Sequence, residues 1–162
     1  MACTPIGLTG DGDENRNERG DDSGAFMIAF FDSSAFIYYF EGAAPYRDAV
    51  LKVLQTVKAQ HPLVAVAISR LGVMECRVKP LREGNAGLLA RYEAFFQQVH
   101  IIELSAAVVD HATRLHATTS LKTPDALQAA CALSLAGPRG FITGDAGFAR
   151  VHGLEILLVR QP

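Results

Sequence analysis

The chain has few cysteines, and their spacing matches neither a disulfide framework nor a zinc site. Cys3, Cys76 and Cys131 are odd in number and far apart, and no C-x-x-C pair occurs. Such usage is typical of proteins in a reducing compartment. We therefore expect a cytoplasmic protein in which the cysteines are small buried apolar residues or, for Cys3, part of a tail.

Long apolar runs are also missing. No run approaches the roughly 20 residues that a helix needs to cross a bilayer. The first 25 residues lack the apolar segment behind a basic end that marks a signal peptide. We therefore expect no membrane association. With 162 residues, 49% of them hydrophobic, the chain can form one domain with a substantial core.

Negative charge is concentrated at the amino terminus. Residues 1–25 hold six acids and two arginines, and they are rich in Gly, Asp and Asn. We expect this segment to be a disordered acidic tail, followed by one folded domain over residues 26–162. The remainder of the chain carries 13 Lys or Arg and 11 Asp or Glu. A mildly basic surface suits a polyanionic substrate, but it is equally consistent with ordinary solvation.

The stretch around which the chain is organised runs from Phe26 to Gly42. Six apolar residues lead directly into Asp32, and two serines and a second apolar segment follow. An unbroken apolar run of this length is typical of a strand covered on both faces, and Ser33 or Ser34 could cap the next helix. Asp32 would then lie at the carboxyl end of a buried strand, where open α/β sheets place their ligands. A carboxylate there is costly unless a partner such as a metal ion compensates it.

Strand and helix patterns alternate along the rest of the chain. Apolar runs predict strands at about 26–31, 63–68, 100–104, 140–143 and 154–159. Helical spacing predicts helices at about 33–41, 46–60, 69–79, 85–99, 105–116 and 123–136, and a short one after 145. In the sixth, we expect Thr123 to be the cap and Pro124 the first helical residue. This alternation predicts an α/β fold, a three-layer α/β/α sandwich around a mainly parallel sheet of about five strands.

Four carboxylates follow the strands or begin the helices: Asp32, Glu75, Asp125 and Asp145. A parallel sheet could bring them to the same edge. Oxygen ligands of this kind suit a hard cation such as Mg²⁺ or Mn²⁺, and a water bound to such an ion can hydrolyse a phosphodiester. Taken singly, each acid could be a turn, cap or exposed helix residue. Together they favour a metal site, and Asp32 is the hardest to explain otherwise.

Four segments at these acids resemble the PIN-domain family, and within it the VapC-like toxins of toxin–antitoxin pairs. They are FFDSSAFI at 30–37, ISRLGVMECRV at 68–78, TPDALQAACAL at 123–133 and FITGDAGFARVHGLEILLV at 141–159. The resemblance covers about residues 27–159. The acidic 25-residue extension departs from the compact family pattern.

The resemblance implies an endoribonuclease with an Mg²⁺ or Mn²⁺ site. It implies that Asp32, Glu75, Asp125 and Asp145 form the acidic quartet and that Ser34 and Thr143 supply supporting hydroxyls. It also implies a homodimer and a small antitoxin whose carboxyl-terminal segment covers the groove of the active site.

Other interpretations and residues remain open. Three basic residues after Glu75, namely Arg77, Lys79 and Arg82, could hold RNA phosphates or simply form a solvated face. A non-catalytic PIN-like RNA-binding or scaffold protein is the main alternative. A haloacid dehalogenase-type phosphatase ranks lower, because it needs a second aspartate where Ser34 stands and another where Ala149 stands. A dinucleotide-binding module lacks its glycine-rich turn here.

Overall fold

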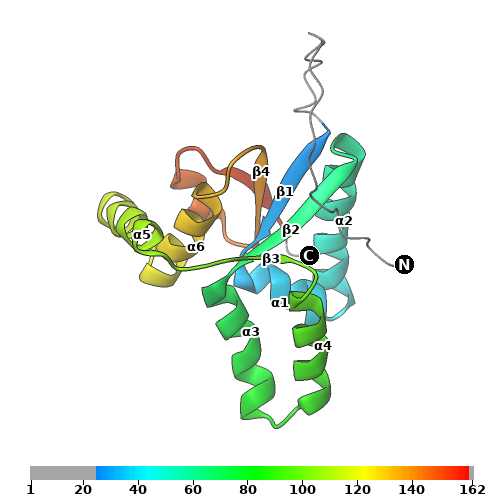
Figure 1. Cartoon of the computed structure of the whole chain (residues 1–162). Helices are drawn as coiled ribbons and strands as arrows, with labels where there is room; N and C mark the ends of the chain where they lie inside the picture. Colours follow the sequence, from blue (N-terminus) through cyan, green and yellow to red (C-terminus); the bar gives the residue numbers. More distant parts are fainter. Residues whose placement is uncertain (1–24, 161–162) are drawn as a thin grey trace, which may run out of the picture.

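The computed structural model describes residues 25–160, which form a five-stranded sheet with all neighbouring strands parallel (Figure 1). The strand order across the sheet is β3, β2, β1, β4 and β5. The strands are β1 (Phe26–Phe31), β2 (Leu63–Ser69), β3 (His100–Ile102), β4 (Arg139–Thr143) and β5 (Glu155–Leu158). The predicted α/β class and parallel five-stranded sheet are confirmed.

Two hydrophobic cores cover the two faces of this sheet. Successive side chains of a strand point to opposite faces, so Phe30 of β1 packs in one core while Ala29 and Phe31 pack in the other. Two helices close the first core: α5 (Ala106–Thr118) and α6 (Thr123–Leu133). The second is closed by α1 (Ser33–Glu41), α2 (Ala44–Gln60), α3 (Arg70–Arg82) and α4 (Ala86–Phe96). Because both faces of β1 are covered, its sequence is one continuous apolar run.

Aromatic side chains fix α1 against α4. Phe36 is fully buried and stacks on Tyr92 and Phe96, with ring centroids 6.2 and 5.9 Å apart. Phe40, one turn further along α1, stacks on Tyr92 at 4.5 Å. Such pairs add about 0.5–1.5 kcal/mol each beyond the burial of their area. These ring contacts hold α1, the helix that Asp32 caps, against α4.

The end of α3 differs from the prediction. The sequence predicts that this helix stops at Lys79, before Pro80, but the helix continues to Arg82 with Pro80 inside it. A proline removes one N–H from the helical ladder and crowds the preceding turn. Here Pro80 is buried, and its carbonyl accepts a hydrogen bond from the Asn85 N–H at 2.8 Å. Burial and this hydrogen bond both favour the place of Pro80 in the last turn of α3.

Two predicted helix caps have different outcomes. Ser69 caps α3 as predicted, because its Oγ accepts a hydrogen bond from the Gly72 N–H at 2.9 Å. Thr123 is the first residue of α6 rather than its cap, and Lys122 takes the cap position without a side-chain bond. Pro124 remains in the first turn, where a missing N–H costs nothing.

The predicted acidic tail, residues 1–25, lies outside the described residues except for Ala25. Within residues 25–160, none of the helices combines the length and the apolar composition needed to span a membrane.

Candidate active site

Asp32 follows β1 directly and caps α1 with its own side chain. Its Oδ1 accepts a hydrogen bond from the Ser34 N–H at 2.6 Å, so the cap is the acid and neither of the two serines that follow it. Its Oδ2 accepts hydrogen bonds from the Ser34 hydroxyl at 3.0 Å and from the Thr143 hydroxyl. Both hydroxyls named from the sequence therefore contact Asp32, which is only 5% exposed.

Burial raises the pKa of Asp32 above its ordinary value, and the negative charge of Asp145 adds to this effect. Hydrogen bonds from Thr143 and Ser34 act in the opposite direction and favour the carboxylate. The net pKa is raised. Ionisation of Asp32 therefore costs more free energy than ionisation of an exposed aspartate, and a nearby cation would lower this cost.

Asp125 and Asp145 lie close enough to Asp32 to interact with it electrostatically. Asp125 is the third residue of α6 and half-buried, and its pKa is raised by burial and then by Asp145 and Asp32. Asp145 is exposed and caps the short 3₁₀ helix η2 (Ala146–Arg150), accepting from the Gly147 N–H at 2.7 Å. Its own N–H donates to the Thr143 Oγ1 at 3.0 Å. The structure therefore brings three of the four predicted acids to one edge of the sheet.

Glu75 reaches this edge through a separate set of contacts. Its Oε2 accepts hydrogen bonds from the Ser33 hydroxyl and from the Gln128 Nε2, the latter at 3.3 Å. From the sequence, Ser33 was named only as a possible helix cap, and Gln128 was not singled out. The only available signal was the position of Gln128 three residues after Asp125, which places both on one side of a helix.

Gly72 makes room for this contact. It lies in α3, three residues before Glu75, and a Cβ atom there would be 2.7 Å from Ile68 Cγ1 and 3.2 Å from Ser33 Oγ. Both distances are shorter than ordinary van der Waals contact. The absence of a side chain at Gly72 therefore allows α3 to approach the beginning of α1.

The donor set fits a hard divalent cation in its chemistry, since all four groups are carboxylates. Within residues 25–160, however, no three Asp, Glu, His or Cys side chains form a ready-made metal cluster. The Glu75 Oε2 is hydrogen-bonded to Ser33 and Gln128, and both Asp32 oxygens accept hydrogen bonds. Mutual repulsion among Asp32, Asp125 and Asp145 is what a cation would relieve.

The basic residues after Glu75 have unequal surroundings. Arg77 forms two hydrogen bonds with Glu93, at 2.6 and 2.7 Å, and Lys79 pairs with Glu41 at 2.8 Å. Arg82 is exposed and forms no ion pair with any residue between 25 and 160. Of the three residues named from the sequence, Arg82 alone has no ion-pair partner in the described part of the chain.

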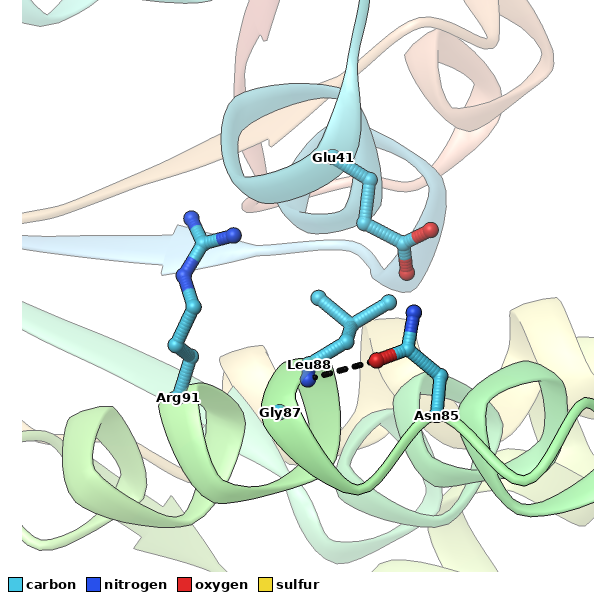
Figure 2. Close-up of a pocket in the computed structure, with 5 residues that line it drawn as sticks. All are labelled: Glu41, Asn85, Gly87, Leu88 and Arg91. Atoms are coloured by element: carbon cyan, nitrogen blue, oxygen red, sulfur yellow. Dashed lines mark hydrogen bonds between the residues drawn. The ribbon is translucent and has the colours of Figure 1, made fainter.

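A separate cavity of about 430 Å³ lies between the end of α1 and the beginning of α4 (Figure 2). It is lined by Glu41, Asn85, Gly87, Leu88 and Arg91, and none of the four predicted acids belongs to it. The Glu41 carboxylate is already bound by the Tyr92 hydroxyl at 2.6 Å and by Lys79. The residues that line this cavity therefore give no reason to place the candidate site there instead of at Asp32.

The fold and these side chains define a class: a parallel α/β domain with an acidic site at the carboxyl edge of its sheet. The chain belongs to the PIN-domain family, since the model of the PIN domain matches residues 29–154. This membership excludes the phosphatase and dinucleotide-binding alternatives. No curated protein matches the sequence significantly.

Solved structures with the same fold include toxin–antitoxin complexes. A toxin–antitoxin complex from Klebsiella pneumoniae is 24% identical, with a TM-score of 0.62 over 83% of this chain and 99% of that one. VapBC2 from Rickettsia felis, bound to a DNA fragment from its promoter, is 16% identical with a TM-score of 0.61, covering 80% and 97%. VapBC-1 from nontypeable Haemophilus influenzae is 20% identical with a TM-score of 0.58, covering 80% and 96%. At these identities the similarity shows the fold.

Proposed function

We propose that this protein is a metal-dependent endoribonuclease and the toxin of a toxin–antitoxin pair. The observation that carries the proposal is the convergence of Asp32, Asp125 and Asp145 at one edge of the sheet, where burial, and then the neighbouring negative charges, raise the pKa of Asp32 and of Asp125. Proteins of the PIN-domain family are generally nucleases and typically use divalent metal ions. The acidic edge fits both properties.

Asp32, Glu75, Asp125 and Asp145 would hold Mg²⁺ or Mn²⁺. Such an ion makes a bound water more acidic and stabilises the leaving oxygen of a phosphodiester. Thr143 and Ser34 keep Asp32 oriented and favour its ionised form through three hydrogen bonds. Asp145, which is exposed, would orient the attacking water or hold the ion through a water molecule.

The substrate in this proposal is RNA, bound through its phosphates. Arg82 is available for such a contact. Arg77 would first have to break its ion pair with Glu93, and Lys79 its ion pair with Glu41, before binding a phosphate. Lys122, at the start of α6, interacts electrostatically with Asp125 and so lies beside the acids. A cation there suits a polyanion that approaches the site.

The proposed protein partners are a cognate antitoxin and a second copy of the chain. The structural relatives named above are complexes of a toxin with an antitoxin, which supports the first. α3 exposes Met74, Val78 and Leu81, with exposed fractions of 53%, 41% and 62%. Apolar residues at this helical spacing are typical of surfaces that protein partners cover.

One observation favours a second candidate, a non-catalytic RNA-binding or scaffold protein: the acids of the described residues form no ready-made metal cluster. Incubation of the purified chain with RNA, with Mn²⁺ or with EDTA, separates the two. A nuclease cleaves RNA only in the presence of the metal. RNA that is bound but remains intact at saturating Mn²⁺ would favour the scaffold.

A further inference from the structure

Gln128 lies at the junction of three helices and has no part in the chemistry proposed above. It belongs to α6, is 3% exposed, and contacts Ser33 at the beginning of α1 and Glu75 in α3. A buried side-chain amide is costly unless its polar atoms are satisfied. Its side-chain hydrogen bonds within residues 25–160 all go to Ser33 and Glu75, which surround the acidic site.

The orientation of this amide follows from its partners. The Ser33 N–H can only donate, so the atom 3.1 Å away from it must be the carbonyl oxygen Oε1 of Gln128. The Nε2 group then faces Ser33 Oγ at 2.8 Å and Glu75 Oε2 at 3.3 Å. Since Nε2 donates to Ser33 Oγ, that hydroxyl is free to give its own hydrogen to Glu75. One arrangement of hydrogens is consistent with the contacts of the amide, the Ser33 hydroxyl and Glu75 Oε2.

These contacts engage one oxygen of Glu75 and leave the other available. Oε2 receives the hydrogen bonds from Ser33 and Gln128, while no hydrogen bond within residues 25–160 reaches Oε1. The carboxylate is thus held by one oxygen with the second free to bind. Outer partners that orient a metal ligand in this way typically change metal affinity by about 10- to 100-fold when they are removed.

The same amide also supports the helix that carries Asp32. The Ser33 N–H is one of the first donors of α1, which have no partner within the helix. The Gln128 Oε1 satisfies this donor, and Asp32 satisfies the next one, on Ser34. The side chain of Gln128 in α6 therefore connects, through hydrogen bonds, Glu75 in α3 with the start of α1, where Asp32 lies.

We propose that Gln128 is a positioning residue that acts through Ser33 to fix Glu75 relative to Asp32 for the binding of a divalent cation. The proposal rests on the metal site of the proposed function. It assigns Ser33 a role different from that of Ser34, since Ser33 orients Glu75 whereas Ser34 orients Asp32.

Calorimetric titration with Mn²⁺ alone, without RNA, tests this role in the wild type, Gln128→Met, Ser33→Ala and the double variant. We expect each single change to weaken Mn²⁺ binding by about 10-fold. The double variant should bind Mn²⁺ about as weakly as the single variant with the lower affinity, because both residues act through one network. Val50→Ala, which creates a cavity in the buried face of α2, is the control for loss of stability. It should lower the melting temperature and leave the Mn²⁺ affinity unchanged.

The outcomes distinguish the two proposals. Wild-type Mn²⁺ affinity in folded Gln128→Met and Ser33→Ala would overturn the positioning role and leave the metal site standing. Absence of Mn²⁺ binding by the wild type would overturn the metal site and the positioning role with it. If Gln128→Met does not fold, Ser33→Ala decides, because it removes the hydroxyl between Gln128 and Glu75 and leaves the amide in place.

Discussion

The Thr143 hydroxyl donates a hydrogen bond to Oδ2 of Asp32, a residue 111 positions earlier in the chain. The two residues follow paired positions of the central strands, since Ile142 of β4 is the partner of Phe31 of β1. Thr143 also accepts a hydrogen bond from the Asp145 N–H at 3.0 Å. One hydroxyl thus joins the most buried acid of the site to the turn that carries the most exposed one.

Replacement of Thr143 by valine should destabilise the protein by about 1–3 kcal/mol, because a buried carboxylate loses a donor while the side-chain shape is kept. RNA cleavage should fall as well, since Asp32 loses one of the hydrogen bonds that favour its ionised form. Urea unfolding measures the first effect. Thr56→Val is the matched control, because this exposed hydroxyl bonds only a carbonyl of its own helix. Equal stability of the two variants would contradict the role of Thr143.

The metal-free protein should become more stable when Asp125 is replaced by asparagine. The folded pKa of Asp125 is raised above its ordinary value of 3.8, mainly by burial and then by Asp145 and Asp32. The folded state therefore binds more protons than the unfolded state in the pH range above 3.8, and stability is lost as the pH rises through the folded pKa. Asp125→Asn avoids this loss, so its melting temperature should exceed that of the wild type at pH 7 and approach it near pH 4.

Added Mn²⁺ should reverse this order by stabilising the wild type more than Asp125→Asn, since ligand binding to the folded state raises its stability. Asp48→Asn, an exposed position in α2, controls for the removal of one negative charge. A melting temperature of Asp125→Asn that stays at or below the wild-type value at every pH would show that the clustered charge is not costly.

Gly72→Ala should cost about 1–3 kcal/mol of stability, because the added methyl group would overlap Ile68 and crowd the Ser33 hydroxyl. Gly87→Ala in α4 is the control: apart from the backbone of the helix itself and the two chain neighbours, the nearest atom to an added Cβ among residues 25–160 is Asn85 Oδ1, at an ordinary contact distance of 3.8 Å. It should be neutral or stabilise the helix by up to about 1 kcal/mol. Thermal unfolding of both variants tests this difference. If Gly72→Ala were as stable as the wild type, α3 and α1 could move apart without loss of stability, which would contradict the role of Gly72.

The sequence predicted the elements that depend on local pattern. The apolar run before Asp32 and the apolar run at 63–68 identify two central strands, and the parallel arrangement brings Asp125 and Asp145 to the edge at which Asp32 lies. The prediction was wrong at two helix ends. Asp32 caps α1 in place of either serine, and Pro80 lies within α3 in place of ending it.

The contacts of Gln128 could not be predicted from spacing. They join residues 95 and 53 positions apart, and they exist only because α6 packs beside both α1 and α3. The ion pairs of Arg77 and Lys79 likewise depend on where α4 and the end of α1 lie. Sequence order shows which charges follow a strand, but it does not show which of them already have a partner.

Arg82→Gln should weaken RNA binding and lower the slope of log K against log salt by about 1, because one phosphate contact is lost. Arg77→Gln should change both quantities less, since Glu93 already neutralises that guanidinium. Binding is measured without Mn²⁺ over a series of salt concentrations, so that no RNA is cleaved. A larger effect of Arg77→Gln would show that RNA displaces Glu93 and would reverse the assignment.

The central claim, that Asp32 belongs to a metal site that cleaves RNA, is tested most directly by Mn²⁺-dependent RNA cleavage. The wild type is compared with Asp32→Ala and with Asp32→Asn, which keeps an oxygen to cap α1. We expect cleavage to fall by more than about 100-fold in both, beyond the usual effect of removing an outer partner. Asp48→Ala, an exposed acid of α2, should cleave like the wild type. Equal cleavage by the wild type and the folded Asp32 variants would contradict the assigned site.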